Sequence, residues 1–152
     1  VALCLLLGFM LGRKSKYEKR DYLKQFKIGK ATYSESLIYE AYGGLQNDGI
    51  MLAVYYDVDA AKIIHQLDSW EKINDSPTIS SILKNVSSYF GLDFVIPEIA
   101  SGNFFLYDNS QHKELRSEAE MNTLLLHSED VNFSLVVWDD EKHTIYIVEY
   151  RI

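Results

Sequence analysis

Hydrophobic and polar positions divide the chain into a short apolar run, a basic stretch and a long mixed region. Residues 1–12 carry no polar side chain except the thiol of Cys4, and Arg13 and Lys14 follow directly. A membrane-spanning helix needs ~20 apolar residues, and the sequence starts at Val1 rather than at Met. We therefore interpret residues 1–12 as the tail of a truncated transmembrane helix, with a buried N-terminal core element as the alternative.

Two other interpretations of this run are a cleaved signal peptide and a lipoprotein signal. A signal peptide ends its apolar region at a small-residue cleavage site, whereas this run stops at Gly12 with a basic cluster behind it. Cys4 fits lipidation poorly, because Leu3 precedes it and the apolar run continues beyond it. Both patterns fit less well than an anchor.

The mixed region contains short runs of β-branched and aromatic residues, the pattern of strands. The first two runs flank the glycine-rich stretch 43–49, which favours a hairpin over a helix followed by a strand. The last two are separated by the polar loop 139–143, which predicts a second hairpin. Apolar residues occupy both faces of that hairpin, so we expect it at the centre of a sheet. The predicted strands are 36–42, 50–57, 102–108, 133–138 and 144–150.

Two segments have the helical spacing of apolar residues instead. One covers residues 60–70 with Asp59 as its N-cap, and the other covers 77–90, where Pro77 stands in the first turn and Gly91 follows the end. Residues 94–99 predict an extended link. The sum is an α+β domain with about five mostly antiparallel strands and two helices packed on one face.

The formal net charge of −7 over 152 residues is unevenly distributed. Residues 1–30 hold eight basic and two acidic residues, a net charge of +6, whereas residues 31–152 hold seven basic and twenty acidic residues, a net charge of −13. We divide the chain into the membrane run 1–12, a basic juxtamembrane segment 13–30 and a single acidic domain 31–152. The cations expected nearest to the membrane are Arg13, Lys14, Lys16, Lys19 and Arg20.

This charge pattern bears on surroundings and partners. Basic residues beside a membrane helix favour the cytoplasmic side, which places the domain in the cytoplasm, with an extracytoplasmic domain as the alternative. Tyr22, Leu23 and Phe26 share one helical face, which predicts that the anchor helix continues along the lipid headgroups. Nucleic acid is an unfavourable partner, because the acidic domain repels a phosphate backbone.

The sequence has no recognisable catalytic motif. No glycine-rich phosphate loop or dinucleotide fingerprint occurs, His127-Ser-Glu129 has no Pro-Cys-x-x-Cys partner, and no Gly-x-Ser-x-Gly elbow is present. We therefore name no catalytic residue and no cofactor.

A metal site is the chemistry that loop residues could still supply by converging in space. The same acidic residues have simpler interpretations, with Asp59 as a helix cap, Asp108 as a turn former and residues 139–141 as a solvated hairpin loop. The candidate metal ligands are Asp108, His112, His127 and His143, with Glu129 and Asp139 near them in sequence. The acidic residues that could contact a partner are Asp48, Asp139, Asp140 and Glu141.

The order of several landmarks resembles a family of small bacterial membrane-anchored proteins whose function is uncharacterised. The resemblance covers residues 36–150 and a similar N-terminal anchor. The chain departs from the family pattern at Asn109, where we expect Arg, and at its last two residues, which weakens a charge-paired site near Asp108. The segments that carry it are Gly44-Leu-Gln-Asn-Asp-Gly49, Trp70 with Pro77, Ile96 to Asp108, Asn132 to Asp139 and Thr144 to Tyr150.

Two functions follow as hypotheses. The first is a non-enzymatic, membrane-tethered domain that binds another protein as an accessory, sensor or immunity-type module, with a basic partner favoured by the acidic surface. The second is a small metal-dependent or acid–base hydrolase that uses the carboxylates and histidines of the loops between residues 108 and 143. The absence of a tight chemical constellation favours the first, and the oligomeric state stays open.

Overall fold

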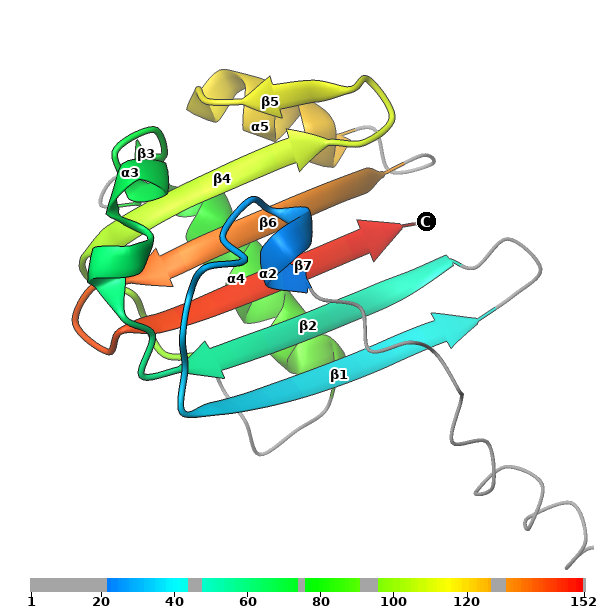
Figure 1. Cartoon of the computed structure of the whole chain (residues 1–152). Helices are drawn as coiled ribbons and strands as arrows, with labels where there is room; N and C mark the ends of the chain where they lie inside the picture. Colours follow the sequence, from blue (N-terminus) through cyan, green and yellow to red (C-terminus); the bar gives the residue numbers. More distant parts are fainter. Residues whose placement is uncertain (1–21, 44–47, 74–75, 91–95, 127–130, 152) are drawn as a thin grey trace, which may run out of the picture.

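A computed structural model describes residues 22–43, 48–73, 76–90, 96–126 and 131–151 (Figure 1). The apolar run 1–12 and the cations Arg13, Lys14, Lys16, Lys19 and Arg20 lie outside these ranges. Gly91, which we expected just past a helix end, and His127 also lie outside them. Within the described ranges, no helix has both the length and the apolar content that crossing a membrane requires.

Seven strands form one antiparallel sheet in the order β1-β2-β7-β6-β4-β3, with β5 also paired to β4. All five predicted strands are confirmed, including both hairpins, and β6 and β7 are central as expected. The sheet has seven strands rather than the predicted five. The two additional strands are only two and three residues long, and such short segments show no periodic pattern in the sequence. The bounds are β1 Glu35–Gly43, β2 Asp48–Tyr56, β3 Glu71–Lys72, β4 Gly102–Asp108, β5 Lys113–Leu115, β6 Asn132–Asp139 and β7 Thr144–Arg151.

The second predicted helix is confirmed as α4 (Pro77–Tyr89). Ser76 is its N-cap, because the Ser76 hydroxyl accepts a hydrogen bond from the backbone N–H of Ile79 at 3.2 Å. Pro77 occupies the first turn, where its missing N–H costs nothing. One face of this helix buries Ile79, Ile82, Leu83 and Val86 against the sheet.

The first predicted helix is shorter than expected. Asp59 is the cap that the sequence predicts, since its carboxylate accepts from the N–H of Ala61 at 3.1 Å. The segment then divides into a single 3-10 turn, η1 (Ala60–Lys62), and a four-residue helix, α3 (Ile64–Leu67). Ile63 lies between them with φ −121° and ends the first turn.

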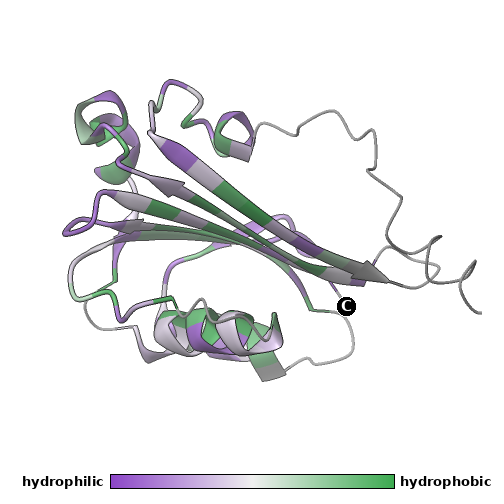
Figure 2. Ribbon diagram, turned by 90° about the horizontal axis from the view of Figure 1, so that it is seen from below, coloured by the Kyte–Doolittle hydropathy of each residue, from purple (hydrophilic) through white to green (hydrophobic). Residues whose placement is uncertain are grey.

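The prediction that both helices pack on one face of the sheet is wrong. Figures 1 and 2 show α4 on one face, and α2 (Tyr22–Gln25) with α3 on the other. Ile63 and Leu67 are buried with Trp138 and Ile147, whose side chains point away from α4. The strands β2, β6 and β7 can serve both layers because they are apolar on both faces.

The segment that we expected along lipid headgroups is packed into the domain instead. Tyr22 and Leu23 are only 2% and 3% exposed and lie in the same apolar cluster as Ile28 and Met51. The Tyr22 hydroxyl donates to the Glu40 carboxylate on β1 at 2.7 Å. The packed domain therefore includes residues from Tyr22 onward, ahead of the predicted boundary at residue 31.

A further helix, α5 (Glu118–Leu126), joins α4 on its face of the sheet. Its start is a capping box, in which the Ser117 hydroxyl accepts from the Glu120 N–H at 3.3 Å and the Glu120 carboxylate accepts from the Ser117 N–H at 3.2 Å. The Glu118 carboxylate reaches the start of α4, where it accepts from the Thr78 N–H at 2.9 Å and the Ser76 hydroxyl at 2.8 Å. Glu118 therefore joins the two helices.

Candidate functional site

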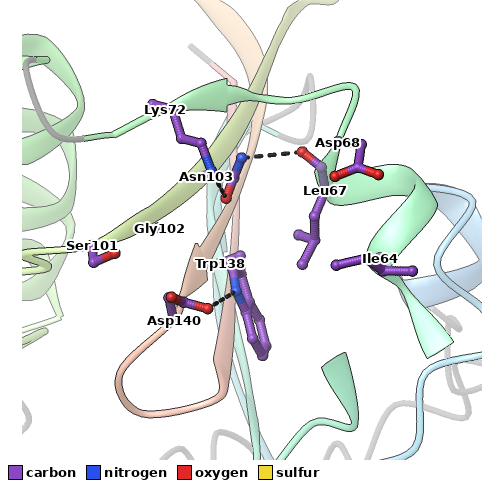
Figure 3. Close-up of a pocket in the computed structure, with 9 residues that line it drawn as sticks. All are labelled: Ile64, Leu67, Asp68, Lys72, Ser101, Gly102, Asn103, Trp138 and Asp140. Carbon is purple, nitrogen blue, oxygen red and sulfur yellow. Dashed lines mark hydrogen bonds between the residues drawn. The ribbon is translucent and has the colours of Figure 1, made fainter. Parts of the chain in front are cut away.

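A polar cleft of about 120 Å³ opens where β4 begins and β6 ends, beside α3 (Figure 3). Its walls come from three parts of the chain: α3 to β3, the start of β4, and the end of β6 with the turn after it. All of its residues lie in the described ranges. They are Ile64, Leu67, Asp68, Lys72, Ser101, Gly102, Asn103, Trp138 and Asp140.

Asn103 organises one side of the cleft. Its side chain is 6% exposed, and its amide donates to the backbone carbonyl of Leu67 at 3.1 Å and to that of Trp70 at 3.5 Å. Its carbonyl oxygen accepts from the Lys72 ammonium at 3.3 Å. Asn103 thus ties the end of α3 to the sheet, and the same side chain positions a cation at the rim of the cleft.

The opposite side is organised by Trp138, whose ring is almost completely buried. The indole N–H donates to the Asp140 carboxylate at 3.3 Å, and the backbone N–H of Asp140 donates to the carbonyl of Ser101 at 3.0 Å. Gly102 begins β4 beside Trp138 on β6, and a Cβ on Gly102 would stand 1.8 Å from the Trp138 carbonyl oxygen. The strands β4 and β6 therefore approach so closely at this point that only glycine fits.

The ionisable groups of the cleft do not neutralise one another. Among the described residues, Asp68, Lys72 and Asp140 form no ion pair, although ion pairs occur elsewhere in the same part of the chain. The cleft therefore presents one ammonium and two carboxylates to solvent above a floor of Leu67 and Trp138 (Figure 3).

A second depression, of about 260 Å³, lies between α4, α5 and the ends of three strands, and its lining residues are uncharged. Tyr89 at its rim is the most exposed of the large hydrophobic side chains, and Leu125 is 39% exposed. Val131 directly follows residues 127–130, which lie outside the described ranges, and Leu125 precedes them by two positions.

A third feature is the outer edge of β1. No described strand pairs with β1 on the side away from β2, and every described side chain from Glu35 to Ala41 is at least partly exposed (Figure 1). The pairing with β2 is continuous over nine residues, without a bulge. The edge thus presents a regular row of backbone donors and acceptors.

Of the candidate metal ligands, the structure describes Asp108, His112 and His143, and it does not bring these three together. Asp108 ends β4 and His112 lies in the exposed loop after it, whereas His143 lies in the β6–β7 turn at the opposite end of β4. The ring of His143 stacks on Trp138 at a centroid distance of 5.7 Å. Within the described ranges, no three His, Cys, Asp or Glu side chains gather closely enough to hold a metal ion.

Asp108 and Asp139 serve equivalent structural roles at the two ends of the sheet. Asp108 accepts from the N–H groups of Ser110 and Gln111 at 2.9 and 3.1 Å, which confirms the turn-forming role. Asp139 accepts from the N–H groups of Glu141 and Lys142, both at 3.1 Å. We expected Asp139 in a solvated loop, and that is wrong, because the turn folds over its side chain and leaves it 2% exposed.

The acidic partner-binding candidates do not form one surface. Asp48 begins β2 at the end of the sheet where β7 finishes, whereas Asp140 and Glu141 lie in the turn at the other end. Of these candidates, only Asp140 belongs to the cleft. Sequence reasoning missed Lys72 and Asn103, and the one available signal was Gly102-Asn103 at the start of a predicted strand.

Comparison with known proteins found no match to a family model, a curated protein or a solved structure. The resemblance to a membrane-anchored family therefore stays an expectation from the sequence, and the function has to be argued from the structure.

Proposed function

We propose that this chain is a non-enzymatic protein-binding module that takes an extended segment of its partner as an added strand along β1. The observation that carries the proposal is the outer edge of that strand, which no described strand covers over nine residues. Exposed sheet edges of this length offer main-chain hydrogen bonds to any extended segment, and strand addition is a common mode of peptide recognition.

The composition of β1 supports this use. Natural edge strands are usually protected by proline, by charged side chains and above all lysine, by a bulge or by a very short length. β1 has neither Pro nor Lys, and its pairing is unbroken. It also carries Ile38 with 39% of its surface exposed, on the opposite face from the half-buried Tyr39. An added strand would bury apolar surface on both faces as well as forming hydrogen bonds.

Charge favours a basic partner over a second copy of the chain. The two charged residues of β1, Glu35 and Glu40, are both acidic and both exposed. Two such strands with a chain charge of −7 repel each other, whereas a strand that carries Lys or Arg gains cross-strand pairs. The partner is therefore an extended segment with basic residues among β-branched ones.

We extend the proposal to a membrane tether, with residues 1–12 as the end of a single-pass helix and the domain on the cytoplasmic side. The support is the apolar run and the basic residues that follow it in the sequence. Protease protection in intact cells, with the complete N-terminus present, tests both parts. Digestion of the domain from outside the cell would contradict the proposed orientation. Recovery of the protein in the soluble fraction would contradict the proposed tether.

The strand-addition proposal is tested with a synthetic nine-residue peptide of alternating Val and Thr, with two Lys placed opposite Glu35 and Glu40 in antiparallel register. Titration into the isotope-labelled chain should shift the β1 amides and slow hydrogen exchange of those that point away from β2. Replacing both Lys by Glu should weaken binding about thirtyfold or more, because each of two cross-strand pairs changes from an attraction of ~0.5–1 kcal/mol to a repulsion of similar size.

The matched protein variants are Ile38→Lys and Leu125→Lys, since both side chains are 39% exposed and only Ile38 lies on β1. Ile38→Lys should weaken binding of the basic peptide, and Leu125→Lys should not. Sedimentation should show a monomer in the absence of peptide. A dimer that Ile38→Lys dissociates would instead assign the edge to a second copy, and binding that ignores both variants would overturn the proposal.

A further inference from the structure

We propose that the polar cleft binds the zwitterion of a small α-amino acid with an apolar side chain. The inference is independent of strand addition, because the cleft lies beside α3 and at the β4–β6 end, and none of its residues belongs to β1. It starts from charges of both signs that are held apart rather than paired.

The cation is positioned by a buried partner. Lys72 donates to the carbonyl oxygen of Asn103, whose own amide is fixed by the backbone carbonyl of Leu67. Two further donors of the Lys72 ammonium remain for a ligand, since an ammonium has three. The Ser101 hydroxyl, which makes no hydrogen bond to another described residue, lines the same cleft. The Lys72 ammonium suits the carboxylate of a ligand.

The anion is positioned in a similar way. The Asp140 carboxylate accepts from the buried indole N–H of Trp138, and its backbone N–H is bonded to Ser101. Asp68, at the end of α3, lies on the other side of the cleft (Figure 3). Carboxylates accept hydrogen bonds only, so Asp140 suits an ammonium. No described cation lies within ion-pairing distance of Asp68 or Asp140.

Size and apolar surface define the rest of the ligand. Ile64, Leu67 and the Trp138 ring line the cleft between the charges, which gives an aliphatic side chain a surface to contact. The volume of about 120 Å³ is well below that of sites for drug-sized ligands, which span ~300–1,000 Å³. Alanine and valine therefore fit the cleft better than a nucleotide or an oligopeptide.

The test is a nuclear magnetic resonance titration of the chain with L-valine, isovalerate and isobutylamine. Isovalerate is valine without its ammonium, and isobutylamine is valine without its carboxylate. L-Valine should give saturable shifts of the Trp138 indole N–H and the Asn103 amide, with half-saturation at roughly 1–10 mM for so few heavy atoms. Each single-charge analogue should bind at least about fivefold more weakly, because it loses one of the two charge contacts, worth ~1 kcal/mol.

Variants assign the two contacts. Lys72→Met should weaken the binding of valine and isovalerate and leave that of isobutylamine unchanged. Asp140→Asn should weaken the binding of valine and isobutylamine. Lys84→Met and Glu98→Gln remove exposed charges of the same sign elsewhere and should not change the binding of valine. A linear response up to ~50 mM valine, or equal binding of all three compounds, would overturn the inference. Neither result would bear on peptide binding at β1.

Discussion

The two edges of the sheet differ in how they meet the solvent. On one side β4 is followed by two short strands, β3 and β5, which pair with different halves of its outer edge. On the other side β1 offers nine residues of backbone that no described strand covers. One edge is broken into pieces of two and three residues, and the other is long and regular.

The two edges also differ in the structural elements that support them. The β4 edge is backed by α5, by the ion pairs Lys113–Glu120 and Arg116–Glu71, and by the buried side chain of Leu115. The β1 edge has none of these supports among the described residues and no protective lysine. Short edge strands discourage pairing with other chains and long ones invite it. This contrast supports our proposal that β1 is the binding edge.

We expect the largest loss of stability at Gly102, where β4 and β6 leave no space for a side chain. Gly102→Ala places a Cβ 1.8 Å from the Trp138 carbonyl oxygen, so β4 and β6 must separate. We expect a loss of about 3 kcal/mol or more in the free energy of unfolding, measured by urea denaturation. Gly29→Ala is the control, because its nearest neighbour is at 3.2 Å and the cost should stay below about 1 kcal/mol. Equal losses would show that the β4–β6 approach is not unusually tight.

A second pair of variants compares the edges directly. Leu115→Ala on β5 removes a side chain that is 4% exposed, whereas Leu37→Ala on β1 removes a partly buried one. The first should cost ~2–4 kcal/mol and the second about 1 kcal/mol, because the loss follows the apolar contact that is removed. Thermal or urea denaturation measures both. A larger loss at Leu37 would mean that β1 is the better packed edge.

The pH dependence of stability should depend on Glu118, behind the closed edge. Partial burial raises the pKa of this carboxyl, but hydrogen bonds from Thr78 and Ser76 outweigh it and lower the pKa below 4.5. The stability gained from this group is therefore present above the pKa of the unfolded chain and lost as the pH falls through the folded value. Glu118→Gln should cost ~1–2 kcal/mol at pH 7 and flatten the stability profile below pH 5.

A suitable control for that experiment is Glu98→Gln, which removes an exposed carboxylate and should leave the profile unchanged. If Glu118→Gln and the unaltered chain lost stability in parallel on acidification, the contact between α5 and the start of α4 would have no role in acid unfolding.

The smallest effect is expected on the open edge itself. Ile38→Lys adds a charge at an exposed position and should change the free energy of unfolding by less than about 0.5 kcal/mol. The same variant should weaken binding of the basic peptide. Circular dichroism during urea denaturation measures the first quantity. A loss of several kcal/mol would show that Ile38 is structural, and the binding experiment would then need another variant.

The sequence was sufficient for the elements that have a long period or a clear cap. Ser76 and Pro77 identify the start of α4, and Asp59 identifies the start of η1. The two hairpins follow from alternating runs around polar turns. It was insufficient for β3 and β5, since two or three residues carry no periodicity. The capping box at Ser117 and Glu120 was present in the sequence and would have predicted α5.

The face of the sheet on which each helix packs could not be predicted from the local sequence pattern. An amphipathic segment shows that it covers a sheet but not which side, and the strands β2, β6 and β7 are apolar on both. The same limit applies to the cleft. Lys72 and Asn103 meet only because β3 pairs with the start of β4, and neither residue is unusual in its own segment.

The most direct test of the account is the position of a bound peptide relative to β1. Intermolecular nuclear Overhauser effects should be measured between the labelled chain and the lysine-bearing peptide. We predict contacts in antiparallel register along Glu35–Gly43, with hydrogen-exchange protection of the outward β1 amides and none gained along β4. Contacts at the β3 and β5 edge, or binding that leaves the β1 amides unprotected, would contradict the claim that the long open edge is the binding surface.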